Sequence, residues 1–353
     1  MRDVHPTPSP EPRRGRSTPR GILALTSVFA LTSVVALAGC VTADYPGPAV
    51  TPTPPASALP AATATATAVP AFPVTLTDDE GTRVTLAAEP QRIASLSPAN
   101  TETVFALGAG DRLVGGTAYD DYPPEAAALP DVATYQGVLM EQLVTQHPDL
   151  VLALGNGAKT SPDVISIRAL GIPVIVLYAA DVPGVLHDIE LIGDAVGSGA
   201  EARIMTAVMQ GNIDAIAAAT SYLDRPRTFY ELGTDPEIYG PADGSFLADM
   251  VSLAGGDPIT TGSSSAYAIS LERLVTADPQ VIVLATGPGY GDTPAAIAAR
   301  AGWTGMTAVK TGALRPVDDI IVTRPGPRLA EGLAALALAI HPGMTLPILV
   351  VSF

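Results

Sequence analysis

The chain has 353 residues, of which 47% are apolar, and its formal net charge is −16. That length suits two domains of ordinary size, and the apolar fraction is sufficient for a buried core. The acidic balance argues against a nucleic-acid ligand, because phosphate binding requires a basic surface, and a single cysteine excludes an intrachain disulfide.

Residues 1–39 have the pattern of an export signal, in which basic residues precede an uncharged apolar run at 21–38. The run ends in Leu37-Ala38-Gly39-Cys40, which resembles a bacterial lipoprotein signal and implies cleavage before Cys40 and lipidation of its sulfur. The alternative is an uncleaved transmembrane helix, since the run is long enough to span a bilayer. Both interpretations anchor the rest of the chain to a membrane, facing the periplasm or the cell exterior.

Residues 40–73 are rich in Thr, Ala and Pro and almost uncharged, which predicts a semi-extended tether rather than a folded segment. After it, residues 74–76 and 83–86 alternate apolar and polar side chains around Asp78-Asp79-Glu80-Gly81. This pattern is typical of a β-hairpin.

We place an N-terminal lobe at 74–199, where predicted strands and helices alternate. The strands are 93–96, 113–115, 150–154 and 173–178, and the helices are 101–107, 140–146, 162–170 and 182–196. Ser97 is a candidate N-cap, with Pro98 at the first helical position. Alternation predicts parallel strands with both sheet faces covered. Ligands of such sheets bind beyond the carboxyl ends of the strands, where the loops carry Asn100, Tyr119, Tyr135 and Asn156.

Residues 200–223 predict one long helix, which suits a rigid connector to a second lobe at 224–353. In that lobe we expect strands at 228–232 and 281–285 and helices at 245–254, 271–277, 295–301 and 328–340. Residues 317–322 lead into a Pro/Gly loop. The apolar tail at 344–353 predicts an edge strand or a terminal packing segment.

An internal repeat relates the two lobes. The segments Glu141–Pro148 and Glu272–Pro279 share Glu, Leu, Val, Thr and Pro at the same spacing, and each runs into an apolar strand. Each glutamate begins a helix, where the helix dipole favours an acid. The functional alternative is that two similar lobes present one carboxylate each to a symmetric basic partner, whose arginines could clamp both.

The runs SLSPANTE (95–102), YDDYPP (119–124), Gln136-Gly137 and PDLV (148–151) resemble the substrate-binding proteins of ABC importers for large metal chelates. Among these the similarity is greatest to members that bind vitamin B12. The resemblance implies the class III fold, which is α/β with two Rossmann-like lobes of parallel sheets covered by helices and joined by one long rigid helix. It also implies a ligand held between the lobes with little closure.

By the same resemblance, Glu141 and Glu272 are the carboxylates that dock onto arginines of an ABC permease dimer. Tyr135 stands where the B12-binding members have a tryptophan, and Ile321 where an aromatic is expected. The implied ligand is cobalamin or a related corrinoid, whose flat amide-edged ring suits aromatic walls with a few amide partners. The implied ligand-binding residues are Ala99, Asn100, Tyr119, Tyr135, Gln136, Tyr239, Tyr267, Asp319 and Arg324.

Several alternatives stay open at this point. Haem or a ferric siderophore would suit the same importer class, and a cell-surface hydrolase or a structural lipoprotein would need no importer. We expect no catalytic residues, because the nucleophile and nucleotide-binding motifs are missing. We expect no metal ligands either, since the histidines (His5, His147, His187 and His341) have no neighbouring ligand cluster. The protein is expected to be a monomer without a cofactor, and Tyr122 is expected to cap a lobe core.

Overall fold

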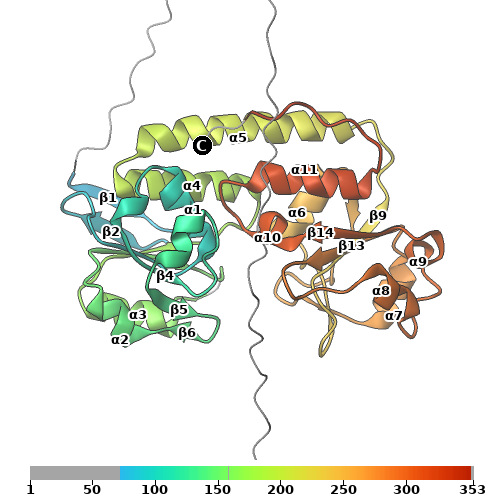
Figure 1. Cartoon of the computed structure of the whole chain (residues 1–353), viewed down its shortest axis with the longest axis horizontal. Helices are drawn as coiled ribbons and strands as arrows, with labels where there is room; N and C mark the ends of the chain where they lie inside the picture. Colours follow the sequence, from blue (N-terminus) through green and yellow to red (C-terminus); the bar gives the residue numbers. More distant parts are fainter. Residues whose placement is uncertain (1–71, 158, 351–353) are drawn as a thin grey trace, which may run out of the picture. The chain divides into compact units, whose positions relative to one another are not determined.

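The computed structural model describes residues 72–157 and 159–350 (Figure 1). The predicted signal peptide, Cys40 and the predicted tether up to residue 71 lie outside the described residues. Within them, no helix is both long and apolar enough to cross a membrane.

The first described element is the predicted hairpin. Strands β1 (Val74–Thr77) and β2 (Arg83–Leu86) pair antiparallel. Asp78 closes the turn by accepting bonds from the backbone amides of Glu80 and Thr82. Its buried carboxylate also forms an ion pair with Arg168 at 2.7 Å, which ties the hairpin to the N-terminal lobe.

The N-terminal lobe (N-lobe) contains a six-stranded sheet in the order β6-β5-β4-β3-β7-β8, parallel except for the β5–β6 pair. The strands are β3 (Ile93–Ser95), β4 (Leu113–Thr117), β5 (Asp131–Thr134), β6 (Gly137–Val138), β7 (Leu150–Leu154) and β8 (Val174–Leu177). The helices are α1 (Pro98–Ala106), α2 (Met140–Thr145), α3 (Pro162–Ala169) and α4 (Val182–Val196), with 3-10 turns η1 (Gly110–Arg112) and η2 (Pro124–Ala128).

The C-terminal lobe (C-lobe) repeats this plan with a four-stranded parallel sheet in the order β11-β9-β13-β14. Its strands are β9 (Arg227–Glu231), β11 (Asp257–Pro258), β13 (Val281–Thr286) and β14 (Leu314–Asp318), and β10 (Ile238–Tyr239) pairs with β12 (Ala268–Ile269). The helices are α6 (Phe246–Leu253), α7 (Leu271–Ala277), α8 (Pro294–Ala299), α9 (Thr307–Thr311), α10 (Asp319–Thr323) and α11 (Leu329–Ile340).

Side-chain alternation along the central strands covers both faces of each sheet, as parallel pairing requires. In β7, Leu150 and Leu152 join one apolar cluster, which contains α1 and α4 residues, while Val151 and Ala153 join another, which contains α2 and α3 residues. In β13 the same alternation sends Val283 toward the shared cluster and Ile282 toward a C-lobe cluster around Trp303. The prediction of covered parallel sheets is therefore confirmed.

The long connector is helix α5 (Gly199–Thr220), whose 22 residues span ~33 Å. Figure 1 shows α5 running above both lobes, with α4 and α11 beneath it. Buried α5 residues such as Met205 and Ile216 belong to one apolar cluster that also contains N-lobe and C-lobe side chains. Within the described residues, the two lobes accordingly belong to a single compact unit.

Some local expectations were wrong. Helix α1 begins at Pro98 with Ser97 as its N-cap residue, as the Ser97-Pro98 pair predicted, but it starts before the predicted range 101–107 and the Ser97 side chain makes no capping bond. No pattern in the sequence predicted β5, β6, β10, β11, β12, β14, α9 or α10, and the segment 317–322 contains the end of β14 and most of α10. Residues 344–350 form no strand, and the alternative of a terminal packing segment is confirmed. Leu346 and Leu349 pack on the core, and Asn212 of α5 exchanges two 2.9 Å bonds with the Val350 backbone.

Candidate functional site

A cleft of about 400 Å³ lies between the lobes, at the carboxyl ends of their parallel strands. Leu154 is the last residue of β7, Tyr178 follows β8, and Leu232 follows β9. Helices α1 and α6 both begin at the cleft. This is where an open parallel sheet is expected to hold a ligand. The lining residues are Ser97, Pro98, Ala99, Leu154, Gly155, Tyr178 and Ala179 from the N-lobe, and Leu232, Ser245, Phe246, Leu247, Tyr267, Thr323, Arg324 and Pro325 from the C-lobe.

The cleft wall is mainly apolar and aromatic, and Arg324 is the one charged residue that lines it within the described chain. Tyr178 and Tyr267 come from opposite lobes and are 37% and 47% exposed. Burial raises the pKa of Tyr267, and the nearby Tyr178 raises it further. Gly157 leaves room for the Tyr178 ring, since a Cβ there would lie 2.4 Å from a ring carbon.

A second aromatic pair stands on the N-lobe. The rings of Tyr119 and Tyr135 lie 6.4 Å apart between centroids and are tilted by 53°. They are 46% and 81% exposed, so most of the Tyr135 ring is available to a ligand. The Gln136 side chain donates to the Tyr135 hydroxyl at 3.2 Å. These three predicted residues therefore lie together.

The segment Tyr119–Tyr122, here called the YDDY loop, is anchored in the N-lobe by the buried Asp120. The Asp120 carboxylate accepts bonds from the Thr117 amide (2.9 Å), the Thr117 hydroxyl (2.6 Å) and the Thr101 hydroxyl (2.8 Å). Thr101 lies on α1, and its hydroxyl oxygen is also 2.8 Å from the Ser95 hydroxyl oxygen of β3. The base of the loop is thus bonded to α1, which begins at the cleft.

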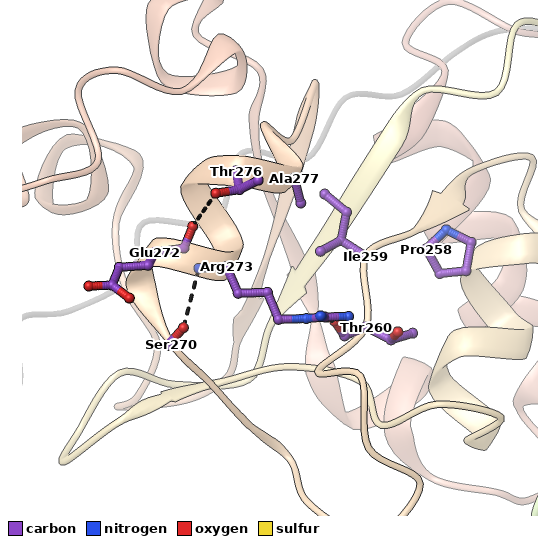
Figure 2. Close-up of a pocket in the computed structure, with 8 residues that line it drawn as sticks. All are labelled: Pro258, Ile259, Thr260, Ser270, Glu272, Arg273, Thr276 and Ala277. Atoms are coloured by element: carbon purple, nitrogen blue, oxygen red, sulfur yellow. Dashed lines mark hydrogen bonds between the residues drawn. The ribbon is translucent and has the colours of Figure 1, made fainter.

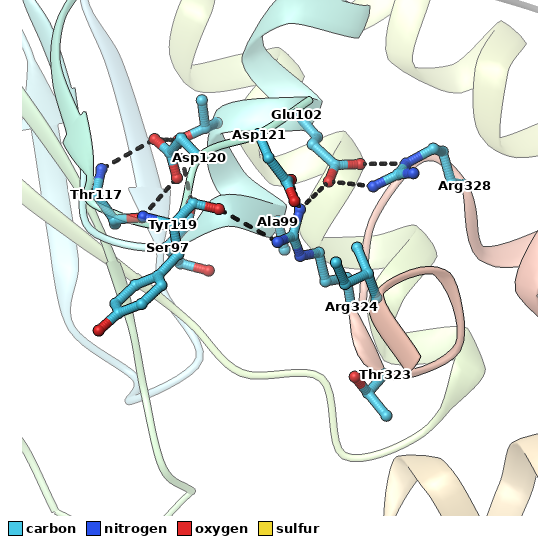
Figure 3. Close-up of polar contacts among 12 residues, drawn as sticks. Ser97, Ala99, Glu102, Thr117, Tyr119, Asp120, Asp121, Thr323, Arg324 and Arg328 are labelled. Carbon is cyan, nitrogen blue, oxygen red and sulfur yellow. Dashed lines mark hydrogen bonds and ion pairs between the residues drawn. The ribbon is translucent and has the colours of Figure 1, made fainter. Parts of the chain in front are cut away.

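The outer part of the YDDY loop is held from the other lobe by the segment Arg324–Arg328, here called the RPGPR loop (Figure 3). Arg324 forms ion pairs with Glu102 of α1 at 2.8 Å and with Asp121 at 2.5 Å, and it donates to the Tyr119 carbonyl at 3.2 Å. Arg328 donates to both oxygens of Glu102, at 2.7 and 2.8 Å.

The ion pairs include buried charge. The Glu102 side chain is only 3% exposed, and a buried carboxylate is costly unless it is paired and hydrogen-bonded. Burial lowers the pKa of Arg324, but the bonds to Asp121 and Glu102 outweigh burial and raise it overall. Arg328 behaves in the same way through Glu102. Both arginines therefore stay charged at any physiological pH.

The other predicted ligand residues are placed differently. Ala99 and Tyr267 line the cleft. Asn100 lies inside α1 and is only 5% exposed, so its assignment to an open loop was wrong. Tyr239 is half-buried on β10, where strand pairing fixes it. Tyr122 does not cap a lobe core, because it is 42% exposed and lies 4.2 Å beneath the Arg328 guanidinium.

Asp319 does not line the cleft. It accepts bonds from the hydroxyls of Tyr230 (3.1 Å) and Tyr290 (3.2 Å), and burial raises its pKa. Ile321, which stands where an aromatic was expected, packs on the apolar core. Sequence reasoning missed Leu154, Tyr178, Leu232 and Phe246. They could have been found, because each directly ends a strand, follows one or begins a helix on the cleft side.

The two repeat glutamates are exposed at the starts of their helices. Figure 1 shows α2 and α7 at the end of the lobes away from α5. Figure 2 shows the Glu272 carboxylate pointing out from α7, whereas Arg273 turns back toward Thr260, whose carbonyl it contacts at 3.3 Å. Glu272 borders a shallow groove of about 570 Å³.

The described residues contain no cluster of His, Cys, Asp and Glu suited to a metal ion. His341 contacts the Gly255 carbonyl at 3.2 Å, and burial lowers its pKa. His187 is 4.0 Å from Asp79. Ser97, the residue on which a hydrolase would depend, is 5% exposed, and its carbonyl accepts bonds from Ser95 and Thr101.

Known proteins resemble both the sequence and the fold. A Bacillus subtilis protein described as an uncharacterized ABC transporter substrate-binding lipoprotein is 33% identical over 77% of this chain and 86% of its own. A Halobacterium salinarum cobalamin-binding protein is 34% identical over 83% of this chain and 82% of its own. The solved vitamin B12-binding protein of Vibrio cholerae has a TM-score of 0.61 and 26% identity, covering 71% of this chain and 96% of its own.

Solved haem-binding proteins have the same fold, so the fold alone does not select a ligand. The relatives are substrate-binding proteins and not enzymes, which removes the hydrolase alternative. The profile of the periplasmic binding protein family matches residues 93–319. This chain belongs to that family, the extracytoplasmic substrate-binding proteins of ABC importers.

Proposed function

We propose that this protein captures cobalamin or a related corrinoid between its lobes and delivers it to an ABC permease. The observation that carries the ligand assignment is the charge of the cleft. Arg324 is the one charged lining residue in the described chain, and it already faces two carboxylates. An anionic ligand would therefore have no unpaired basic side chain to bind among the described lining residues.

The absence of an unpaired basic residue from the described lining distinguishes between the candidate ligands by their charge. Haem carries two propionates and many ferric siderophores are anionic, so their sites need unpaired basic groups. The corrin edge carries neutral amides, for which aromatic faces and hydroxyl or carbonyl partners suffice. Tyr119, Tyr135, Tyr178 and Tyr267 supply four partly exposed aromatic faces in and beside the cleft.

The size of the cleft is also informative. Its 400 Å³ lies toward the lower end of the roughly 300–1,000 Å³ of ligand pockets. A corrinoid would fill the cleft and extend past its mouth. The exposed rings of Tyr119 and Tyr135 would then cover the part of the ligand that projects.

Delivery would use the acidic side chains at the tips of the lobes. Glu141 and Glu272 are exposed on α2 and α7, so a permease with one basic cluster per subunit could bind both. Lipidation at Cys40 would hold the protein close to that permease. This part of the proposal is supported by the Leu37–Cys40 motif and by the lipoprotein name of the Bacillus subtilis relative.

Isothermal titration of the folded domain with cyanocobalamin, haem and ferric hydroxamate tests the ligand. We expect binding of cyanocobalamin in the submicromolar range or tighter, on the order of 8 kcal/mol or more, and much weaker binding of haem. Tight binding of haem or of the siderophore, with none of cobalamin, would overturn the ligand assignment and leave the importer role in place.

A further inference from the structure

Arg324 lies where a cleft arginine could bind a ligand directly, but all its polar contacts in the structure are to the opposite lobe. Nη1 donates to Glu102 and Asp121, and Nη2 donates to the Tyr119 carbonyl. The three acceptors belong to the N-lobe, whereas Arg324 follows helix α10 of the C-lobe. The side chain therefore crosses the junction between the lobes.

The buried Glu102 carboxylate fixes the position of the Arg324 guanidinium. Glu102 lies inside α1, is 3% exposed, and also pairs with Arg328 through both oxygens. A carboxylate shared by two arginines and buried at this depth cannot reorient without exposing unpaired charge. The Arg324 guanidinium is therefore held against Glu102 of α1, and in that position it also contacts the YDDY loop.

The YDDY loop has two distinct sets of contacts. Asp120 binds Thr117 and Thr101 within the N-lobe. Tyr119 and Asp121 bind Arg324, and the Tyr122 ring lies beneath Arg328. Three of the four loop residues are consequently held by the C-lobe. Figure 3 shows the Tyr119 carbonyl facing Arg324 while the Tyr119 ring extends in the other direction.

We propose that Arg324 is a positioning residue: from the C-lobe it holds the YDDY loop, and with it the Tyr119 ring, in the orientation that receives the ligand. The half-exposed Asp121 supplies the second charge for this contact. The orientation of an aromatic wall in one lobe is in this way set by the other lobe. The effect on ligand affinity rests on the proposed function, whereas the effect on the loop does not.

Hydrogen exchange without ligand tests the loop directly. In Arg324→Gln, amide exchange in the peptide covering residues 117–124 should accelerate at least ~10-fold, because a charge-assisted bond is worth about one decade or more. Asp121→Asn should give a smaller change in the same peptide. Arg315→Gln is the matched control, since Arg315 contacts only nearby backbone carbonyls, of Gly312 and Leu314. Unchanged exchange in both loop variants would overturn the proposal.

A double-mutant cycle with cyanocobalamin then separates positioning from direct contact. We expect Arg324→Gln alone to weaken binding about tenfold, and to weaken it less than ~2-fold when Tyr119→Ala is already present. Independent, additive losses would show that Arg324 acts on the ligand itself and would overturn the proposal. If the unmodified protein binds no corrinoid, the proposed function fails, and the exchange experiment still decides the role of Arg324.

Discussion

The two lobes each contain a corner where a short helix turns into a central strand, and the corners share a backbone plan but differ in one side chain. We call them the N-lobe corner (Arg92 with residues 141–149) and the C-lobe corner (Arg227 with residues 272–280). Arg92 Nε donates to the carbonyls of residues 146 and 147 at 2.9 and 3.1 Å. Arg227 Nε donates to those of residues 277 and 278 at the same two distances.

The match extends along each corner. Thr145 and Thr276 donate to the carbonyls of Glu141 and Glu272, at 2.8 and 2.7 Å. The residue before the shared proline is left-handed in both, with φ of 48° at His147 and 47° at Asp278. Such a conformation is unfavourable for a residue other than glycine. Because the left-handed conformation occurs in both lobes, we infer that the two corners share the turn geometry. That geometry places the glutamate on the outside of each lobe.

The difference lies in what the left-handed residue does. Asp278 accepts bonds from the Thr307 amide (2.7 Å) and hydroxyl (2.8 Å) and pairs with Arg227, which fixes the start of α9. The bonds from Thr307 lower its pKa. Beyond the proline the corners are similar, because Asp149 accepts bonds from the Gln91 and Arg92 amides and Gln280 accepts one from the Arg227 amide. The two corners therefore share a backbone geometry and an exposed glutamate, although different side-chain hydrogen bonds stabilise them.

If the corners act as equivalent docking points, removing both acids should have the largest effect. We expect Glu141→Ala combined with Glu272→Ala to abolish stimulation of permease ATPase in reconstituted vesicles, because the docking charges are gone. Ligand affinity should not change. Glu125→Ala with Glu237→Ala, one exposed acid from each lobe, is the matched control. A double variant that stimulates normally would refute the docking role, and a loss caused by one corner alone would refute the equivalence.

The segments that follow the two corner arginines differ in one side chain, at a position that is buried in the C-lobe. Glu231 lies four residues after Arg227, where the N-lobe has Leu96 four residues after Arg92. Burial, together with the smaller effect of the nearby Asp292, raises the pKa of Glu231 to about 7. Because the folded pKa lies above the ordinary 4.5, the cost of ionising this group is absent below pH 4.5 and fully present above pH 7.

We therefore expect Glu231→Gln to stabilise the protein at pH 8 by about 2–3 kcal/mol and to have little effect at pH 4.5. Urea unfolding at the two pH values measures this. An equal effect at both would show that Glu231 does not titrate in the folded protein.

Capping also separates the corners. Ser270 caps α7 by accepting a bond from the Arg273 amide, whereas the N-cap residue of α2 is Leu139, whose side chain cannot accept a hydrogen bond. Ser270→Ala should cost about 1 kcal/mol in unfolding experiments, and Ser270→Asn should restore most of it. No loss in the alanine variant would mean that the cap is not used.

The smallest expected effect tests the left-handed residues themselves. His147→Gly should stabilise the protein by about 0.5–1 kcal/mol, since glycine relieves the strain at positive φ and the Arg92 bonds go to backbone atoms. Asp278→Gly should instead destabilise it, because the bonds to Thr307 are lost. Thermal melts compare the pair.

The pH dependence sharpens this test. The depressed pKa of Asp278 gives stability that is present above its ordinary pKa of 3.8 and is lost as the pH falls further. The difference between Asp278→Gly and the natural protein should therefore shrink in acid. If both glycine variants change stability in the same direction, the bonds of Asp278 to Thr307 are not what distinguishes the two corners.

Local patterns were sufficient for much of the fold. Apolar runs ending at Pro or Gly predicted β7, α4 and α7 to the residue, because burial of a continuous strand or of one helix face leaves a strong periodic signal. The repeat around Glu141 and Glu272 was visible for the same reason. Short elements such as β6 and β10 have only two residues each, too few to show a period.

The sequence by itself determined the two like α/β lobes, the long connecting helix and the exposed corner acids, since each depends on residues close together in the chain. Only the tertiary structure decided that Asn100 is buried, that Tyr178 faces the cleft and that Arg324 is committed to Glu102 and Asp121. The Arg324 contacts join residues more than 200 positions apart. No local pattern encodes such pairs, because they exist only once both lobes have packed against α5.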